Sequence, residues 1–313
     1  MSDLEIRPLR AGETDLFLSY PHAPVPGVGM ESRRSYAELA EANQYRPEWT
    51  WVALRDGAVV ARCAFWGVPE ETHPYSLDWL EPGHEPDRVE IGARMLRAAL
   101  AELSAPDGGR PEYHLFLPPN WREDPVVAGA AHDRLEAAAL AGYEPFIERF
   151  NYTWSADGDP APRRSDRLVF EPVDDTEATG ICLAVIDGSL DGYTRRDVAR
   201  HGAAEAARIM VADLVEFPSP REWWRVARTP HGEPVGLIVP ARNHTRAVVG
   251  YIAVLPEQRG KGYVDDLLAE TTALLVEHGA DAVGADTDLG NRPMAAAFVR
   301  AGYRNTAIRV VLQ

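Results

Sequence analysis

Lysine is almost missing from this chain of 313 residues, which has a single lysine, Lys261, among its 32 basic residues. Aspartate and glutamate number 48, so the formal net charge is −16 at pH 7. Proteins that bind duplex nucleic acid need a basic face, because phosphate charges must be neutralised. The composition therefore argues against a nucleic-acid partner. It favours either plain solubility or the attraction of cationic small molecules.

Cysteine is also scarce: the sequence holds Cys63 and Cys182 and no C-x-x-C pair. This excludes a disulfide framework and a zinc ribbon, and it is typical of a reducing compartment. No His, Cys or carboxylate pair has metal-ligand spacing, so we expect no metal. The sequence shows neither a run of about 18 apolar residues nor a signal peptide. We therefore expect a cytoplasmic protein without a membrane partner.

The composition that remains is that of a globular protein, with 45% hydrophobic and 26% charged residues. The length predicts about two domains. Residues 155–166, SADGDPAPRRSD, are rich in the small and polar residues that favour a linker. We therefore expect one domain over residues 1–154 and another over residues 167–313.

The two halves repeat one order of elements. Each is predicted to open with a short strand, to pass through a partly helical stretch into a hairpin, and to alternate strands and helices before a closing strand. Asp56-Gly57 marks the first hairpin turn and His231-Gly232 the second. The expected elements are strands 4–9, 113–117, 146–154, 167–173, 247–255, 281–287 and 306–312, hairpins 50–66 and 223–240, and helices 89–103, 131–140, 264–278 and 292–301.

The stretch from Ala253 to Val264, AVLPEQRGKGYV, holds two glycines between an apolar strand and a helix. Glycines let successive N–H groups approach a ligand, and a helix N-terminus adds unpaired donors and a partial positive charge. Arg259 and Lys261 add full charges. The stretch therefore predicts a site for a phosphate or pyrophosphate. It is neither a Walker loop nor a dinucleotide fingerprint, because both glycine patterns are absent.

A second motif, NRPMAAAFVRAGY at residues 291–303, follows the loop after one helix and one strand. Together with PEQRGKGYVDDLL at residues 256–268, it makes the second half resemble the GNAT acyltransferase superfamily. The resemblance is good over residues 221–313, and the repeated order of elements extends it to the whole chain. It implies an α/β (α+β) fold of two tandem GNAT-like domains, each a mixed central sheet flanked by helices.

The resemblance implies an acyl-CoA site in the second half, with pantetheine added along the strand before the loop. Arg259 and Gly262 match the family pattern Arg/Gln-x-x-Gly-x-Gly/Ala, whereas Val264 stands where the family has a small residue. Asn291 would contact the pantetheine arm, and Phe298 occupies the place of a tyrosine that many relatives use as an acid. The residues expected to bind acyl-CoA are Ile252, Ala253, Val254, Arg259, Gly260, Lys261, Gly262, Tyr263, Val264, Asn291 and Phe298.

Acyl transfer from a thioester to an amine needs a proton acceptor, attack geometry and a donor for the oxyanion. A backbone N–H near Ala253 or Val254 is expected to be that donor. Many relatives have a glutamate base on the same strand, but residues 249–251 of this chain carry no acid. The catalytic candidates are Asp288, Asp286 and Tyr251. Each also has a structural interpretation, as a capping or surface acid or as a core tyrosine.

The acceptor side is expected in residues 187–202, DGSLDGYTRRDVARHG, which cover the acceptor in the family fold. Asp187, Asp191 and Tyr193 are the candidates for holding a cationic amine. The neighbouring arginines also allow an amine that bears a carboxylate, and helix capping is an equally good interpretation of the acids. The first half lacks the glycine loop and has acids in its place, so we expect it to be catalytically silent.

The sequence thus predicts an N-acetyltransferase that moves an acetyl group from acetyl-CoA to a small-molecule amine, by direct attack in the second domain. The alternative is a non-catalytic acyl-CoA-binding or sensing protein, because the family's glutamate and tyrosine are missing. A third hypothesis is a structural protein without a ligand. Turnover with an amine, binding without turnover, and no CoA binding would separate the three.

Overall fold

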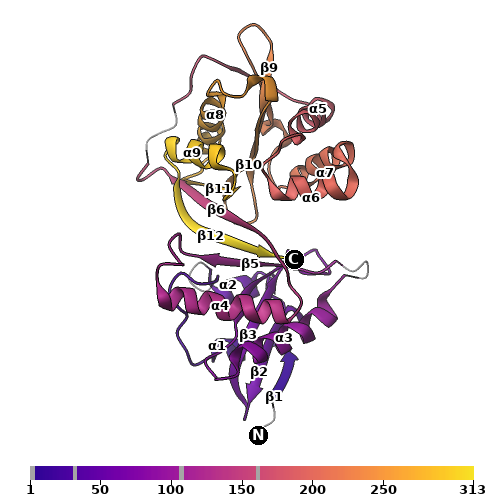
Figure 1. Cartoon of the computed structure of the whole chain (residues 1–313), viewed down its shortest axis with the longest axis vertical. Coiled ribbons are helices and arrows are strands. Elements are labelled where there is room, and N and C mark those ends of the chain that lie inside the picture. Colours follow the sequence, from indigo (N-terminus) through magenta and orange to yellow (C-terminus); the bar gives the residue numbers. More distant parts are fainter. Residues whose placement is uncertain (1–3, 31–33, 106–108, 160–162) are drawn as a thin grey trace. The chain divides into compact units, whose positions relative to one another are not determined.

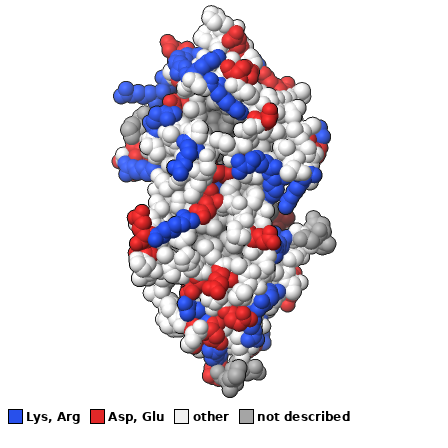
Figure 2. Space-filling model, in the orientation of Figure 1, with Lys and Arg blue, Asp and Glu red and all other residues white. Residues whose placement is uncertain are grey.

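The computed structural model describes residues 4–30, 34–105, 109–159 and 163–313 (Figure 1). The chain forms two compact units. Unit 1 comprises Met1–Glu148 and Ala307–Gln313, and unit 2 comprises Arg149–Thr306. Within the described ranges, no helix is both long and apolar enough to cross a membrane. On the face shown in Figure 2, acidic and basic side chains are interspersed.

Unit 1 is a mixed sheet with the strand order β1-β2-β3-β4-β5-β12, in which β4 and β5 run parallel. Helix α3 packs on α4 and contacts the first three strands. A separate aromatic cluster includes Phe17, Tyr36, Tyr45 and Trp79. The elements are β1 (Leu4–Pro8), α1 (Thr14–Leu18), α2 (Tyr36–Glu41), β2 (Thr50–Arg55), β3 (Ala58–Trp66), β4 (Ser76–Glu81), α3 (Arg88–Leu103), β5 (Glu112–Leu117) and α4 (Pro125–Leu140), with β12 (Arg304–Leu312) contributing its last residues.

Unit 2 is a mixed sheet with the order β6-β11-β10-β9-β8-β7, covered by α8 and α9 on one face and by α5 to α7 on the other (Figure 1). Alternation along β10 divides its side chains between two cores. Tyr251 and Ala253 pack with α5 and α7, whereas Val249 and Ile252 pack with α8 and α9. The elements are β6 (Pro145–Ser155), β7 (Val169–Pro172), α5 (Asp175–Ile186), α6 (Gly192–His201), α7 (Ala203–Val215), β8 (Arg225–Arg228), β9 (Pro234–Arg242), β10 (Ala247–Val254), α8 (Tyr263–Glu277), β11 (Ala282–Asp288) and α9 (Arg292–Arg300).

The closing strand of each half belongs to the unit that the other half builds. Residues 149–155 of β6 pair antiparallel with β11, and residues 308–312 of β12 pair antiparallel with β5. The units therefore do not coincide with the predicted division into residues 1–154 and 167–313. Parts of the predicted division lie outside the described residues. They are residues 160–162 of the linker and residues 1–3, 31–33 and 106–108 of the first domain.

Both predicted hairpins and the predicted order of helices are confirmed, but strand β4 was missed. Its sequence, SLDWLE, carries two acids in a strand that is buried along its whole length. Asp78 accepts a hydrogen bond of 2.8 Å from the hydroxyl of Tyr45, and Glu81 lies 2.6 Å from Arg134. Buried acids are tolerated where such partners exist. These partners lie far away in the sequence, so no local pattern indicated the strand.

The exchange of closing strands predicts which elements will be destabilised by a cavity in each core. Val311 on β12 and Leu268 on α8 are both fully buried. Truncation of either to alanine should cost on the order of 2 to 4 kcal/mol, through lost burial and the cavity left behind. Hydrogen–deuterium exchange should then accelerate in β5 for Val311→Ala and in α8 and α9 for Leu268→Ala. Faster exchange of α8 in the Val311 variant, with β5 unaffected, would contradict the assignment of β12 to unit 1.

Candidate functional site

The two central strands of unit 2 separate soon after they meet. Parallel pairing of β10 with β11 covers two residue pairs, at Ala247 and Val248. A bulge at Gly250 then shifts the register between β10 and β9. A Cβ on Gly250 would lie 2.9 Å from atoms of β9, so only glycine fits this bulge. Because a bulge bends its strand, β10 turns away from β11 and leaves a gap between them.

The edge of β10 that faces the gap presents unpaired backbone groups. The N–H of Leu255 donates to the carbonyl of Val235 on the β9 side at 2.9 Å. Backbone groups alternate sides along an antiparallel strand, so those of Ile252 and Val254 point toward the gap. The Nε of Arg259 lies 3.3 Å from the carbonyl oxygen of Val254. The N–H groups of Ile252 and Val254 therefore face the gap, whereas that of Ala253 faces β9.

The loop after β10 is built around two left-handed glycines, Gly260 and Gly262, each with φ of 77°. Side chains with a Cβ are strained at this angle. Helix α8 begins directly after the second glycine. The backbone N–H groups of residues 260–264 donate to no backbone carbonyl among the described residues. Successive free N–H groups at a helix N-terminus form a nest for an anion.

The charges around this loop also favour an anion. Arg259 lines the loop, and the ammonium of Lys261 donates to the neutral amide oxygen of Gln258 at 2.8 Å, so its charge is not cancelled. Of the two acids in the first turn of α8, Asp265 is paired with Arg300 at 2.8 Å and Asp266 with Arg167 at 3.1 Å. The partial positive charge at the N-terminus of α8 is therefore not cancelled by an unpaired acid in its first turn.

A cavity of about 450 Å³ is lined by both the loop and the gap-facing residues of β10. Nine of the residues predicted to bind acyl-CoA line it: Ile252, Ala253, Val254, Arg259, Gly260, Gly262, Tyr263, Val264 and Asn291. Lys261 does not line it, and Phe298 lines a different cavity. Asn291 acts locally as the N-cap of α9, accepting from the N–H of Met294 at 3.3 Å.

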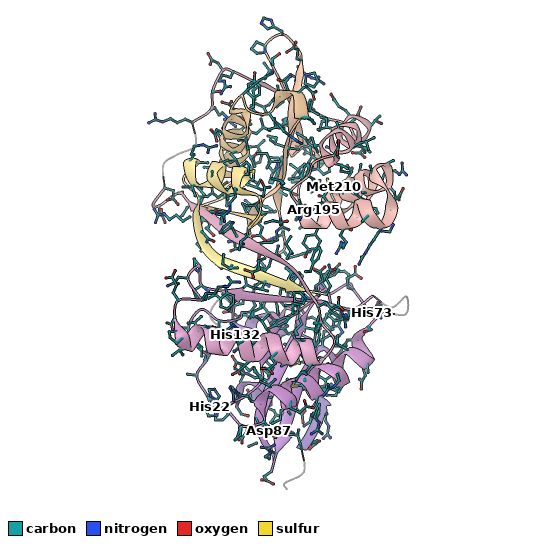
Figure 3. The ribbon with its side chains drawn as sticks, in the orientation of Figure 1. His22, His73, Asp87, His132, Arg195 and Met210 are labelled. Carbon is teal, nitrogen blue, oxygen red and sulfur yellow. The ribbon has the colours of Figure 1, made fainter. Side chains whose placement is uncertain are left out.

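A second cavity of about 390 Å³ lies against α6, α7, β10 and β11. Its wall includes Met210, which Figure 3 labels on α7, and the side chains of Phe217 and Phe298. The residues that line both cavities are Asp191, Thr194, Tyr251, Ile252, Asn291 and Met294. A molecule in one cavity can therefore meet a molecule in the other beside Ile252, where the strand edge is unpaired.

The two aspartates of β11 have different surroundings. Asp286 lines the second cavity, and its carboxylate accepts a hydrogen bond of 2.6 Å from Asn151. Asp288 lines neither cavity and is 4% exposed. It accepts from the N–H of Gly192 at 2.6 Å and lies 3.2 Å from Arg149. Burial raises the pKa of Asp288, and Arg149 opposes that shift. Asp288 thus joins β11 to the start of α6, and Asp286 is the aspartate of β11 that a ligand can reach.

The hydroxyl sought for proton transfer is not at the cavity surface. Tyr251 lines both cavities, but burial raises the pKa of its hydroxyl well above the usual range, and the hydroxyl contacts the thiol of Cys182. Burial therefore favours the protonated hydroxyl. Phe298 is fully buried and stacks on Tyr152, with ring centroids 5.1 Å apart.

Only two of the three residues predicted to hold the acceptor line the second cavity. Tyr193 lines the second cavity, with the guanidinium of Arg196 4.9 Å from its ring centroid. Asp191 lines both cavities but caps α6, accepting from the N–H of Thr194 at 2.8 Å. Asp187 lines neither cavity.

Sequence reasoning missed two residues of β6 that complete the second cavity. Asn151 is 4% exposed and holds Asp286. Arg149 lines the cavity, lies 3.4 Å from Asp191 and stands over the ring of Tyr193 at 5.6 Å. No local pattern indicated them, because β6 closes the first half in sequence and only the strand exchange brings it beside β11. Among the described residues, no three His, Cys, Asp or Glu side chains converge as a metal site would require.

Comparisons with known proteins agree with this geometry. Residues 196–303 match the profile of the Acetyltransferase (GNAT) family. No curated protein matches the sequence. A GCN5-related N-acetyltransferase from Sphaerobacter thermophilus superposes with a TM-score of 0.57 at 14% identity, with 99% of this chain and 94% of that chain covered.

Two further structures cover the whole length of the chain. A glucosamine N-acetyltransferase region of a fungal multi-domain GH3 beta-N-acetylglucosaminidase gives a TM-score of 0.52 at 13% identity, covering 100% of this chain and 38% of that one. A tandem GNAT protein from the clavulanic acid biosynthesis pathway gives 0.48 at 16% identity, with coverages of 99% and 98%. At these identities the likeness concerns the fold. The expected fold class, two tandem GNAT-like domains with mixed sheets flanked by helices, is confirmed.

The pair of Arg149 with Asp288 predicts a pH-dependent loss of stability. Arg149→Met would leave a buried carboxylate without its cation, which costs about 3 to 5 kcal/mol. The folded-state pKa of Asp288 is already raised and should rise further, so the folded protein binds the proton more tightly than the unfolded chain. The loss should therefore be largest near pH 8 and shrink as the pH falls toward 5.

Thermal melts of the wild type and the variant across this pH range measure the difference. Adding Asp288→Asn to Arg149→Met should remove the pH dependence of that difference. A difference in Tm that does not vary with pH would show that Asp288 is not the group responsible.

Proposed function

Because residues 196–303 form a domain of the GNAT acetyltransferase family, we propose that this chain transfers an acetyl group from acetyl-CoA to the amine of a small molecule. The observation that carries the proposal is the nest of N–H groups at residues 260–264, which opens on the unpaired edge of β10. An anion nest next to a free strand edge suits a ligand with a pyrophosphate and an amide-containing arm. Acyl-CoA has both.

The charge of the second cavity favours a cationic acceptor. Its wall holds four carboxylates, Asp191, Asp197, Asp213 and Asp286, and two guanidinium groups, Arg149 and Arg196. The guanidinium groups are already paired with acids: Arg149 with Asp191 and Asp288, and Arg196 with Asp197 at 2.8 Å. An incoming ligand therefore meets a net negative wall, which attracts an ammonium group.

The wall also provides a base for the reaction. The transfer forms a bond between the amine nitrogen and the acyl carbon and breaks the carbon–sulfur bond, while the amine loses a proton. Asp286 is the carboxylate placed to accept that proton, because it lines the acceptor cavity and Asn151 orients it. The N–H groups of Ile252 and Val254 would stabilise the oxyanion. Phe298, in the place of the family's proton-donating tyrosine, has no hydroxyl, so we propose that solvent protonates the leaving thiolate.

We propose that the first half binds no acyl-CoA. Its strands β4 and β5 also part after two residue pairs, at Ser76 and Leu77. A cavity of about 260 Å³ at the end of β4 is lined by the buried ion pair of Glu81 with Arg134 and by Asp133, which is paired with Arg88. Its acids are paired with arginines, and the stretch after β4 lacks the two-glycine loop of the second half. With both thiols free and buried, we also propose a cytoplasmic location.

One observation favours a second function, a non-catalytic acyl-CoA sensor. Phe298 offers no hydroxyl, and the hydroxyl of Tyr251 is buried against Cys182. A sensor would bind acetyl-CoA with the same loop and would release no CoA with any amine. Calorimetry with acetyl-CoA followed by a thiol-release assay over a panel of amines separates the two functions.

The loop geometry predicts a matched pair of glycine variants. Gly262→Glu places a strained side chain and a negative charge in the nest and should weaken acetyl-CoA binding by at least about 100-fold, roughly the cost of two charged hydrogen bonds. Gly279→Glu is the control, because Gly279 has a similar φ of 83° but ends α8 at its far end. Calorimetry should show binding retained in the control. Equal affinity in both variants would remove the loop from the site.

The proposed base predicts a kinetic signature. Asp286→Asn should lower kcat by about 100-fold or more, the usual contribution of a general base, and leave the KM for acetyl-CoA unchanged. Asp281→Asn, an exposed change just before the same strand, is the control. Steady-state kinetics with the best amine of the panel make the measurement. A kcat within two-fold of the wild type would exclude Asp286 as the base.

A further inference from the structure

Arg167 reaches the anion loop from outside the part of the chain that matches the GNAT family. Its Nη2 donates to the carbonyl oxygen of Lys261 at 2.7 Å. Its Nη1 lies 3.1 Å from the carboxylate of Asp266, and its guanidinium stands 4.8 Å from the ring centroid of Tyr263. One side chain thus contacts the loop and the first turn of α8 together.

The bond to Lys261 constrains the next N–H group. The carbonyl of Lys261 and the N–H of Gly262 belong to one planar trans peptide, so they point in opposite directions. While Arg167 holds the carbonyl on its own side, the N–H of Gly262 must point to the other side, toward the nest. Glycines on both sides of Lys261 would otherwise let this peptide turn at little cost.

The short segment before β7 holds Arg167 in place. The hydroxyl of Ser165 donates to Asp266 at 2.6 Å and accepts from the N–H of Arg167 at 3.3 Å. Arg164 pairs with Glu270 and Glu277 further along α8. Residues 164–167 therefore lie along the helix, with the guanidinium of Arg167 at its N-terminal end. Arg164 makes the same kind of contact without touching the loop.

We propose that Arg167 is a positioning residue for the pyrophosphate of acyl-CoA, acting through the peptide between Lys261 and Gly262. This rests on the proposed function of the loop. Arg167 needs no contact with the ligand for this role. It fixes the direction of one donor in the nest and, by neutralising Asp266, removes an acid from the helix start.

The test compares two donors, acetyl-CoA and acetyl-pantetheine, because the second lacks the pyrophosphate. Arg167→Ala should raise the KM for acetyl-CoA about ten-fold, the value of one oriented donor to a charged group, with kcat unchanged. The KM for acetyl-pantetheine should not change. Arg164→Ala should change neither, and Arg167→Lys, which can still donate to the carbonyl, should restore part of the affinity.

Two results would overturn the proposal: an unchanged KM for acetyl-CoA in Arg167→Ala, or an equal rise for both donors, which would indicate general damage to the fold. A readout independent of turnover is the shift of the Gly262 amide resonance on adding inorganic pyrophosphate. It should appear in the wild type and Arg164→Ala and be lost in Arg167→Ala. That pattern in a protein that turns over no amine would reject the proposed function and keep the role of Arg167. No shift in the wild type would reject both.

Discussion

The early separation of β10 from β11 is the constraint on which the rest of unit 2 depends. A sheet normally satisfies each backbone group with a neighbour, and an unpaired edge inside a domain is costly. Here the bulge at Gly250 ends the pairing after two residue pairs, and the exposed edge becomes a wall of the cavity. The gap therefore explains both the site and the covering helices, because α5 to α7 and α8 to α9 must pack on strands that no longer support each other.

The strand exchange compensates β11 for the backbone pairing that it loses at the gap. With β10 parted from β11, β11 needs a full partner on its other edge, and β6 pairs along its whole length from residue 282 to residue 288. The same strand carries Arg149 and Asn151 into contact with Asp288 and Asp286. A segment from the first half thus pairs with the sheet of unit 2 and adds Arg149 to the wall of the second cavity.

The sequence predicted the loop better than the chemistry, and the difference is physical. Glycines at 260 and 262, an apolar strand and a helix are local features, so the sequence alone predicted an anion loop there. The family resemblance added the residues expected to bind acyl-CoA, nine of which line one cavity. Asp286 and Asp288 looked equivalent in sequence, because only the contacts with Asn151 and Gly192 distinguish a reachable carboxylate from a buried one. Strand β4 and the exchange of β6 and β12 were not predicted for the same reason, since they depend on partners far away along the chain.

A chain of net charge −16 can still present a site suited to a polyanion. The structure does it mainly without net charge: the donors of the nest are backbone N–H groups, whose dipoles are fixed by the fold and attract an anion whatever the total charge. The acids that could oppose them are neutralised, Asp265 by Arg300 and Asp266 by Arg167. The single lysine then adds its charge beside the loop. At the second cavity the same acidity has the opposite effect, because four carboxylates and two paired guanidinium groups make a net negative wall that favours a cation. Anion donors and carboxylates thus line neighbouring cavities along β10.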